Sequence, residues 1–340
     1  MQNKTVRKLF VCEFITCGGL NGEHLPLGLA QEGRLMRDAL FRDLQSLESW
    51  QVSTTHDVRV GRSQYTSDSV EVNANTDVLA LWQDCMQEAD YVWIIAPESS
   101  NILYQLTEMA SARNKVIIGA DLAAIAIASN KYKTAQVLQH ANISTIPTYY
   151  FDEWQPQDHK SQWVVKPVDG AGCEETFLFE NEQSLRLWFE AHRDKQVTHI
   201  IQPYLKGIPA SVSVLGYSGG IQILSCNLQH ISQQGGKLTY EGGEINGASA
   251  YWQSLEPLLH RLNKVLPGLQ GYYGVDVLLD ARDLDKITLV EINPRLTTSY
   301  VELRHAISCN PAEIILNALT VNDFIMPTIT KKKIRFDLTH

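Results

Sequence analysis

Near the C-terminal end of the chain, two short apolar segments each carry an acidic residue in a position that disfavours it. The segments are GVDVLLD (274–280) and LVEINPR (289–295), and their composition predicts the two strands of a β-hairpin. Pairing Asp276 with Glu291 centres the turn between Asp283 and Leu284, within the polar stretch ARDLDK, where a turn is expected independently. Two carboxylates that face each other across a sheet repel. The hairpin therefore predicts a cation between them.

The second strand of this hairpin adds an amide to the predicted site. A period of two places Leu289, Glu291 and Asn293 on one face of the strand. Carboxylate and amide oxygens are hard ligands that suit Mg²⁺, which also binds substrate phosphates, and Mn²⁺ accepts them as well. The alternative is that Asp276 pairs with an arginine or lysine elsewhere in the chain.

A second candidate site lies in WVVKPVDGAG (163–172). Lys166 ends an apolar strand, and Gly170 and Gly172 follow it. A lysine supplies a cationic contact for phosphate, and successive glycine amides can form an anion-binding concavity. Taken alone, such glycines more often make an ordinary turn, and such a lysine usually extends into water. The segment is neither a Walker A motif nor a dinucleotide fingerprint.

The segment HIIQPYLKG (199–207) is a third candidate. Its apolar strand meets Pro203, which cannot donate a hydrogen bond to a neighbouring strand. The strand should therefore bend or reach an edge here, and exposed backbone groups at such a bend can read the edge of a purine. The alternative is a plain strand followed by a turn.

The pattern of apolar segments changes along the chain. Up to about residue 120, short apolar strands at 8–14, 92–97 and 115–119 alternate with helical spacing over about 28–48 and 102–113, which predicts an α/β unit with a parallel sheet. Later segments, from about residue 199, are predicted to be richer in β-strands. We predict three units, with boundaries at 1–125, 126–200 and 201–340.

Charge and composition exclude several classes of protein. The chain has 29 lysines and arginines against 38 acidic residues, a net charge of −9, so tight generic binding to nucleic acid or to anionic membranes is not expected. No apolar run approaches the roughly 20 residues of a membrane span, and the N-terminus lacks a signal-peptide core. The six cysteines form no CxxC pair, which is typical of reduced thiols in a cytoplasmic protein. Small molecules are therefore the expected partners.

Taken in order, four segments resemble the ATP-grasp superfamily. They are SNKYKTAQVLQHANISTIP (129–147), the lysine–glycine segment, the HIIQPYLKG segment and the hairpin, and together they cover about residues 125–305. The resemblance implies an α/β fold in which a parallel-sheet pre-ATP-grasp domain precedes the two ATP-grasp lobes. The sequence departs from the family pattern at Asn130, where Asp is common, at Gln202, where Glu is usual, and at Cys173, where Gly is frequent.

The resemblance also implies a role for each matching residue. Lys131 and Lys166 would contact the ATP phosphates, together with the loop of Gly170 and Gly172. Gln202 and the backbone at Tyr204 and Leu205 would meet the adenine. The metal ligands would be Asp276, Glu291 and Asn293. Arg295 would lie near the γ-phosphate or an acyl phosphate, where a guanidinium stabilises charge on phosphoryl oxygens, and Lys166 would share this catalytic role.

A narrower resemblance connects both ends of the chain to one group of enzymes. The segments CEFITCGGL, LAQEGRLMRDALFRDL and EINPRLTTSYVELR are similar to tyramine–glutamate ligases of methanofuran biosynthesis and their bacterial relatives. This implies an ADP-forming carboxylate–amine ligase that works through an acyl phosphate, with glutamate as acid and tyramine or tyrosine as amine, in a chain that could form a homodimer.

Other readings of the same motifs stay open. The chain could be an ATP-grasp kinase or carboxylase of another metabolite, or a regulator that binds Mg-ATP without turnover. Four charged residues are candidate substrate contacts, although each such residue is more often a solvated surface charge; they are Glu13, Glu32, Arg34 and Arg304.

Overall fold

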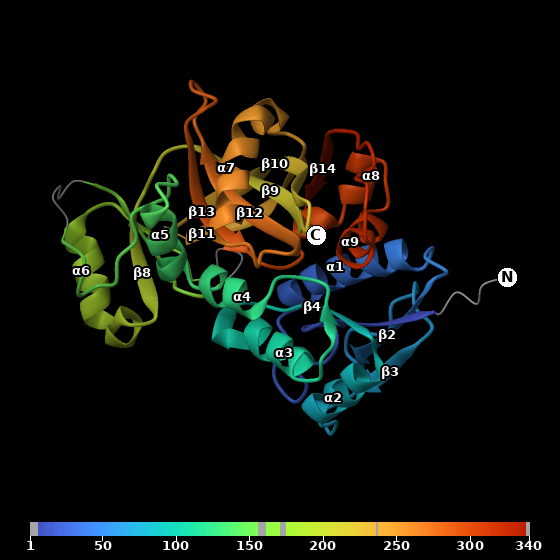
Figure 1. The fold of residues 1–340 in the computed structure, drawn as a ribbon. Helices are drawn as coiled ribbons and strands as arrows, with labels where there is room; N and C mark the ends of the chain where they lie inside the picture. Colours follow the sequence, from blue (N-terminus) through green and yellow to red (C-terminus); the bar gives the residue numbers. More distant parts are fainter. Residues whose placement is uncertain (1–5, 156–160, 171–174, 236, 338–340) are drawn as a thin grey trace.

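The computed structural model describes residues 6–155, 161–170, 175–235 and 237–337. Two sheets organise the chain, a parallel one in the N-terminal part and a larger antiparallel one in the remainder. Figure 1 shows the N-terminal part, coloured blue to teal, below the antiparallel sheet, with the green segments around α6 and β8 set to one side. Among the described helices, none is both long and apolar enough to cross a membrane.

The N-terminal sheet is parallel throughout, as the short apolar segments predict, with strand order β3-β2-β1-β4-β5. Its strands are β1 (Arg7–Glu13), β2 (Trp50–Asp57), β3 (Ser69–Val72), β4 (Tyr91–Ile95) and β5 (Val116–Ile117). Its helices are α1 (Leu27–Leu44), α2 (Val78–Glu88) and α3 (Ile102–Ser111). Glu13 pairs with Ile95 at the ends of β1 and β4. The residues that follow these two strands therefore meet at one edge of the sheet, where open α/β sheets bind ligands.

Helix α1 lies between this sheet and the C-terminal part of the chain (Figure 1). Its buried stripe recurs every four residues, at Met36, Leu40 and Leu44, and it packs against α9 (Pro311–Thr320) and the 3₁₀-helix η4 (Thr298–Tyr300). Glu32 lies one turn before Met36 on the same face. The apolar stripe of α1 therefore carries an acidic residue towards the interior.

The antiparallel sheet follows the order β13-β12-β9-β10-β11-β7-β6-β8. Its strands are β6 (Trp163–Pro167), β7 (Phe177–Phe179), β8 (His199–Pro203), β9 (Ile208–Tyr217), β10 (Gly220–Gln234), β11 (Lys237–Ile245), β12 (Gly271–Leu279) and β13 (Ile287–Asn293), with β14 (Ile334–Asp337) added beside β11. The remaining helices are α4 (Leu122–Ala128), α5 (Lys131–His140), α6 (Glu182–Ala191), α7 (Trp252–Val265) and α8 (Leu303–Ile307). Among the described residues, the pair of Lys237 with Phe177 joins the strands β6–β8 to the rest of the sheet.

The hairpin of β12 and β13 confirms that Asp276 faces Glu291. A bulge directly after this pair lets Val277 face Leu289, so the turn is centred one half-residue earlier than expected, at Asp283. The bulge also reverses the alternation. Leu289 therefore packs in the apolar core with Val277, and the expectation that it shares a face with Glu291 and Asn293 is wrong.

The described residues form two large apolar clusters and a small one. One large cluster runs from Phe10 of β1 through α4 to Val275 and Leu289 of the hairpin, so the N-terminal sheet and the hairpin share a continuous core. The small cluster belongs to the strands β6 and β8 and to α6 and is built on Trp154, Trp163 and Phe189. The segment from β6 to β8, called the small lobe below, therefore has a core of its own.

Candidate active site

A cavity of about 330 Å³ lies where the small lobe, the hairpin and α1 meet. Its walls come from β6, β8, β11, β12, β13 and α1. The predicted site residues that line it are Lys131, Lys166, Gly170, Gln202, Tyr204, Leu205, Asp276, Glu291, Asn293 and Arg295. Gly172 and Cys173 lie outside the described residues. Segments separated by more than 150 residues in the sequence thus share one cavity.

Two lysines approach the same carboxylate oxygen in this cavity. Lys131 Nζ lies 3.6 Å and Lys166 Nζ 3.5 Å from Glu291 Oε2, and Lys131 also donates to the carbonyl of Gly170. Lys131 is the first residue of α5, and the side chain of Asn130 caps this helix by accepting from the Lys133 amide. Asparagine caps a helix as well as aspartate does, so this departure from the family pattern preserves the position of Lys131.

The pKa values of the two facing carboxylates, Asp276 and Glu291, are shifted in opposite directions. Burial and the charge of Glu291 raise the pKa of Asp276 to about 7. Burial also raises the pKa of Glu291, but the ammonium groups of Lys131 and Lys166 outweigh it and hold that pKa well below its usual range. Asp276 accepts hydrogen bonds from Gln229 Nε2 at 3.1 Å and from Asn293 Nδ2 at 3.2 Å.

This donor set fits a hard divalent cation. It contains two facing carboxylates and an amide, and mutual repulsion of the carboxylates is what a cation relieves. No three His, Cys, Asp or Glu side chains cluster as metal ligands in the part of the chain that the structure describes. A cation held by these few ligands would leave positions for substrate phosphates and water, which is the usual coordination of Mg²⁺.

Arg295 is fixed by a residue that the sequence analysis missed. Its Nη2 lies 2.8 Å from Glu98 Oε2, and the two side chains are only 11% and 5% exposed. Glu98 follows β4 in the segment IIAPE, at the carboxyl edge of the parallel sheet. An acidic residue directly after a buried parallel strand is a signal that could have identified it. The pair joins the N-terminal sheet to the segment after the hairpin.

The segment after β8 forms the other end of the cavity. Gln202 is buried in β8 and donates from Nε2 to Thr148 Oγ1 at 2.8 Å. The Tyr204 amide donates to the Gln162 carbonyl, whereas the Leu205 backbone makes no hydrogen bond to another described residue. Pro203 ends the strand, as expected. The free backbone of Leu205 can therefore meet a ligand.

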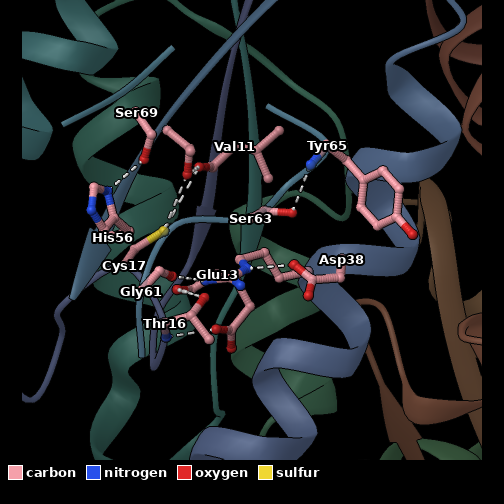
Figure 2. Close-up of polar contacts among 12 residues, drawn as sticks. Val11, Glu13, Thr16, Cys17, Asp38, His56, Gly61, Ser63, Tyr65 and Ser69 are labelled. Carbon is pink, nitrogen blue, oxygen red and sulfur yellow. Dashed lines mark hydrogen bonds and ion pairs between the residues drawn. The ribbon is translucent and has the colours of Figure 1, made fainter. Parts of the chain in front are cut away.

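The four charged residues predicted as possible substrate contacts lie in different surroundings. Glu32 lines the cavity, whereas Arg34 is exposed and Arg304 pairs with Asp43 at 2.9 Å. Glu13 is buried at the end of β1 and accepts from the Thr16 amide at 2.7 Å; Figure 2 shows it among the polar contacts at this end of the sheet. The glycine-rich stretch from about 235 to 250 is mostly the strand β11, whose Tyr240 also lines the cavity.

Comparison with family models identifies two adjoining domains. An ATP-grasp domain model matches residues 128–299, half of the chain, and a pre-ATP-grasp domain model matches residues 50–125.

Two curated relatives carry the same name. The chain is 26% identical over 295 residues to a tyramine–L-glutamate ligase of Methanocaldococcus fervens, an alignment that covers 86% of the chain and 88% of that protein. It is 30% identical over 218 residues to a tyramine–L-glutamate ligase of Methanocaldococcus jannaschii, which covers 64% of the chain and 59% of that protein.

Solved structures share the fold at lower identity. An ATP-grasp superfamily protein from Archaeoglobus fulgidus superimposes with a TM-score of 0.70 at 22% identity, covering 97% of this chain and all of that one. An L-amino acid ligase from Bacillus licheniformis gives 0.65 at 17% identity, covering 92% of this chain and 74% of that one. The arrangement of sheets described above is therefore one that these proteins share.

Proposed function

Since the chain belongs to the ATP-grasp family, we propose that it is an ATP-dependent ligase that joins a carboxylate to an amine and releases ADP and phosphate. The observation that carries this proposal is the convergence of Lys131 and Lys166 on Glu291, opposite Asp276, within one cavity. These four groups come from three separate segments of the sequence, and each has the charge that a metal–triphosphate complex requires.

We assign the ends of the cavity to the parts of ATP. The free Leu205 backbone and Gln202 would contact the adenine, and the two lysines with Gly170 would contact the phosphates. Asp276, Glu291 and Asn293 would hold a divalent cation, for which Mg²⁺ is proposed. When bound, the cation neutralises charge on the phosphates. Arg295, held by Glu98, would stabilise the acyl phosphate that forms when the acid attacks the γ-phosphorus.

We propose glutamate as the acid and tyramine as the amine. The support is the name of both curated relatives, one of which aligns over 86% of this chain. The amine attacks the acyl carbon of glutamyl phosphate, an amide bond forms and phosphate leaves. The task of the protein is to position the two reactants and to neutralise charge, as in other phosphoryl transfers.

The test follows an oxygen atom from the acid to the phosphate. Purified protein is incubated with Mg-ATP, tyramine and glutamate whose carboxylates are labelled with ¹⁸O, and the products are analysed by mass spectrometry. We expect ADP, an amide and phosphate carrying one ¹⁸O, because the acid oxygen attacks the γ-phosphorus. AMP with pyrophosphate, or unlabelled phosphate beside an amide, would contradict the acyl-phosphate mechanism.

The same assay separates the alternatives. A labelled phosphate with a different amine would leave the mechanism in place and replace only tyramine. A kinase would release a phosphorylated acid and no amide, and a regulator would bind Mg-ATP without forming ADP.

A further inference from the structure

Glu32 is the cavity carboxylate to which the proposed chemistry gives no role. The described acidic residues that line the cavity are Glu32, Asp276 and Glu291, and the last two are the proposed metal ligands. Glu32 comes from the inward face of α1, in the N-terminal unit. Its side chain makes no hydrogen bond or ion pair with another described residue. Burial raises the pKa of Glu32, and Arg295, the cation that acts on it, offsets this only in part.

The cations of the cavity are already engaged by other carboxylates. Lys131 and Lys166 approach Glu291, and Arg295 lies 2.8 Å from Glu98. Uncharged polar residues that also line the cavity include Tyr240, Thr297, Thr298 and Ser299. A half-buried carboxylate without a cationic partner is unfavourable. A ligand with a positive charge would remove this cost.

The position of Arg295 indicates where Glu32 lies with respect to the proposed acyl phosphate. Both side chains line the same cavity, the charge of each shifts the pKa of the other, and Arg295 is the residue assigned above to the acyl phosphate. A cationic ligand held at Glu32 would therefore share the cavity with the acyl phosphate assigned to Arg295. Of the two proposed substrates, the one that must reach the acyl carbon with its nitrogen is the amine.

We infer that Glu32 binds the ammonium group of the amine substrate and accepts its proton as the amine attacks the acyl phosphate. This inference rests on the proposed ligase function. The ammonium gives one proton to the Glu32 carboxylate, and the freed lone pair forms the C–N bond. The bond between the acyl carbon and the phosphate oxygen then breaks, phosphate leaves with that electron pair, and the second amine proton passes to the leaving phosphate.

The test uses two nucleophiles with the variants Glu32→Gln and Glu32→Asp. Tyramine is protonated at neutral pH and needs a base, whereas hydroxylamine is uncharged and traps an acyl phosphate as a hydroxamate without one. We expect Glu32→Gln to lower kcat/KM for tyramine by about tenfold to a hundredfold, the loss typical of a charged hydrogen-bond partner. Hydroxamate formation from glutamate and the KM values for ATP and glutamate should stay within about twofold of wild type.

Glu32→Asp keeps the charge and should restore part of the tyramine rate, and it keeps the test open if the Gln variant fails to fold. Glu108→Gln, on the exposed face of α3, is the matched control and should leave both reactions unchanged. An unchanged kcat/KM for tyramine in Glu32→Gln would overturn the inference and leave the ligase function standing. So would a selective rise in KM for glutamate, which would assign Glu32 to the acid. If the wild-type protein forms neither hydroxamate nor amide, the proposed function fails and the inference falls with it.

Discussion

Two ammonium groups within 3.6 Å of one carboxylate oxygen make Glu291 the electrostatic centre of the cavity. Lys131 and Lys166 are only 9% and 10% exposed, so neither charge is well solvated, and both approach Glu291. The same carboxylate is proposed to bind the cation. A change at this position therefore acts on the lysines and on the metal together.

Replacing Glu291 with glutamine should abolish most turnover. The amide keeps the shape of the side chain but removes a hard anionic ligand, so we expect ADP release at limiting Mg²⁺ to fall by about a hundredfold or more. Lys131 and Lys166 also lose a buried counter-charge, which should lower the free energy of unfolding by roughly 3 kcal/mol. Glu256→Gln, exposed on α7, is the control. ADP release near the wild-type rate would show that Glu291 is not a metal ligand.

Lys166→Ala should weaken the binding of ATP far more than that of AMP. Lys166 is the penultimate residue of β6 and lines the cavity, and its assigned contacts are the phosphates that AMP lacks. Calorimetry on both nucleotides measures the difference, with an expected loss of about tenfold or more for ATP and little for AMP. Equal losses for the two nucleotides would move Lys166 away from the phosphates.

Glu13 should make stability depend on pH. Burial raises the pKa of Glu13 to about 7 from its ordinary value of 4.5. The folded protein therefore binds this proton more tightly than the unfolded chain, and the stability that results is present at low pH and lost as the pH rises from about 4.5 to 7. Glu13→Gln keeps an acceptor for the Thr16 amide without titrating. Between pH 5 and pH 8, the free energy of unfolding measured by thermal unfolding should fall by roughly 2–3 kcal/mol less in the variant than in the wild type. Parallel pH profiles of the two proteins would contradict this.

At the scale of elements, the strand β11 shows why some structure could not be predicted. Its stretch EGGEI contains two glycines, a composition typical of a loop. In the structure, a side chain at Gly242 would meet the Phe336 carbonyl of β14, and one at Gly243 would meet the Leu228 carbonyl of β10. The glycines allow two neighbouring strands to approach closely. Because β14 lies almost 100 residues later, no local pattern reveals this need.

The hairpin illustrates the opposite case. The pairing of Asp276 with Glu291 could be predicted because antiparallel register follows from the position of the turn, and the polar ARDLDK stretch marks that turn. The bulge after this pair could not, because no glycine or proline lies at the bulge itself, at 276–277 or at 289–291. The division of the chain at about 125 and 200 stays a prediction, as do the roles of the individual site residues.

Gly243→Ala should destabilise the sheet at β11. The added methyl group would run into the Leu228 carbonyl, so one strand must shift, at a cost of about 2 kcal/mol. Gly28→Ala is the control, since a side chain there meets nothing within 4 Å and α1 gains a better helix former. The unfolding temperature should therefore fall in Gly243→Ala and stay level or rise in Gly28→Ala. A stable Gly243→Ala protein would show that β10 and β11 do not pack so closely.

At the scale of the whole molecule, two ion pairs among the described residues connect the N-terminal unit to the residues after the hairpin, and each contains a buried carboxylate. Glu98 pairs with Arg295 in the wall of the cavity. Asp43 of α1 pairs with Arg304 of α8 at 2.9 Å and accepts from the Tyr300 hydroxyl at 3.0 Å, among residues that do not line the cavity. Each pair joins residues roughly 200 or more positions apart, so sequence reasoning found neither. One pair lies at the proposed reaction centre and the other does not, which makes them a matched set.

Glu98→Gln and Asp43→Asn should therefore have different effects. Glutamine can still hydrogen-bond to Arg295 but no longer holds it with a full charge, and a guanidinium displaced by even 1 Å loses much of its effect on a developing negative charge. We expect kcat in Glu98→Gln to fall about tenfold, while the Kd for ATP measured by calorimetry stays unchanged. Asp43→Asn removes a comparable buried charge, so it should lower the unfolding temperature but leave kcat within about twofold at a temperature where the protein is folded. If both variants are less stable and kcat is unchanged in both, the Glu98–Arg295 pair only stabilises the packing of the N-terminal unit against the rest of the chain. A selective loss of kcat in Glu98→Gln would mean that the N-terminal unit takes part in the reaction through a residue more than 150 positions from the hairpin.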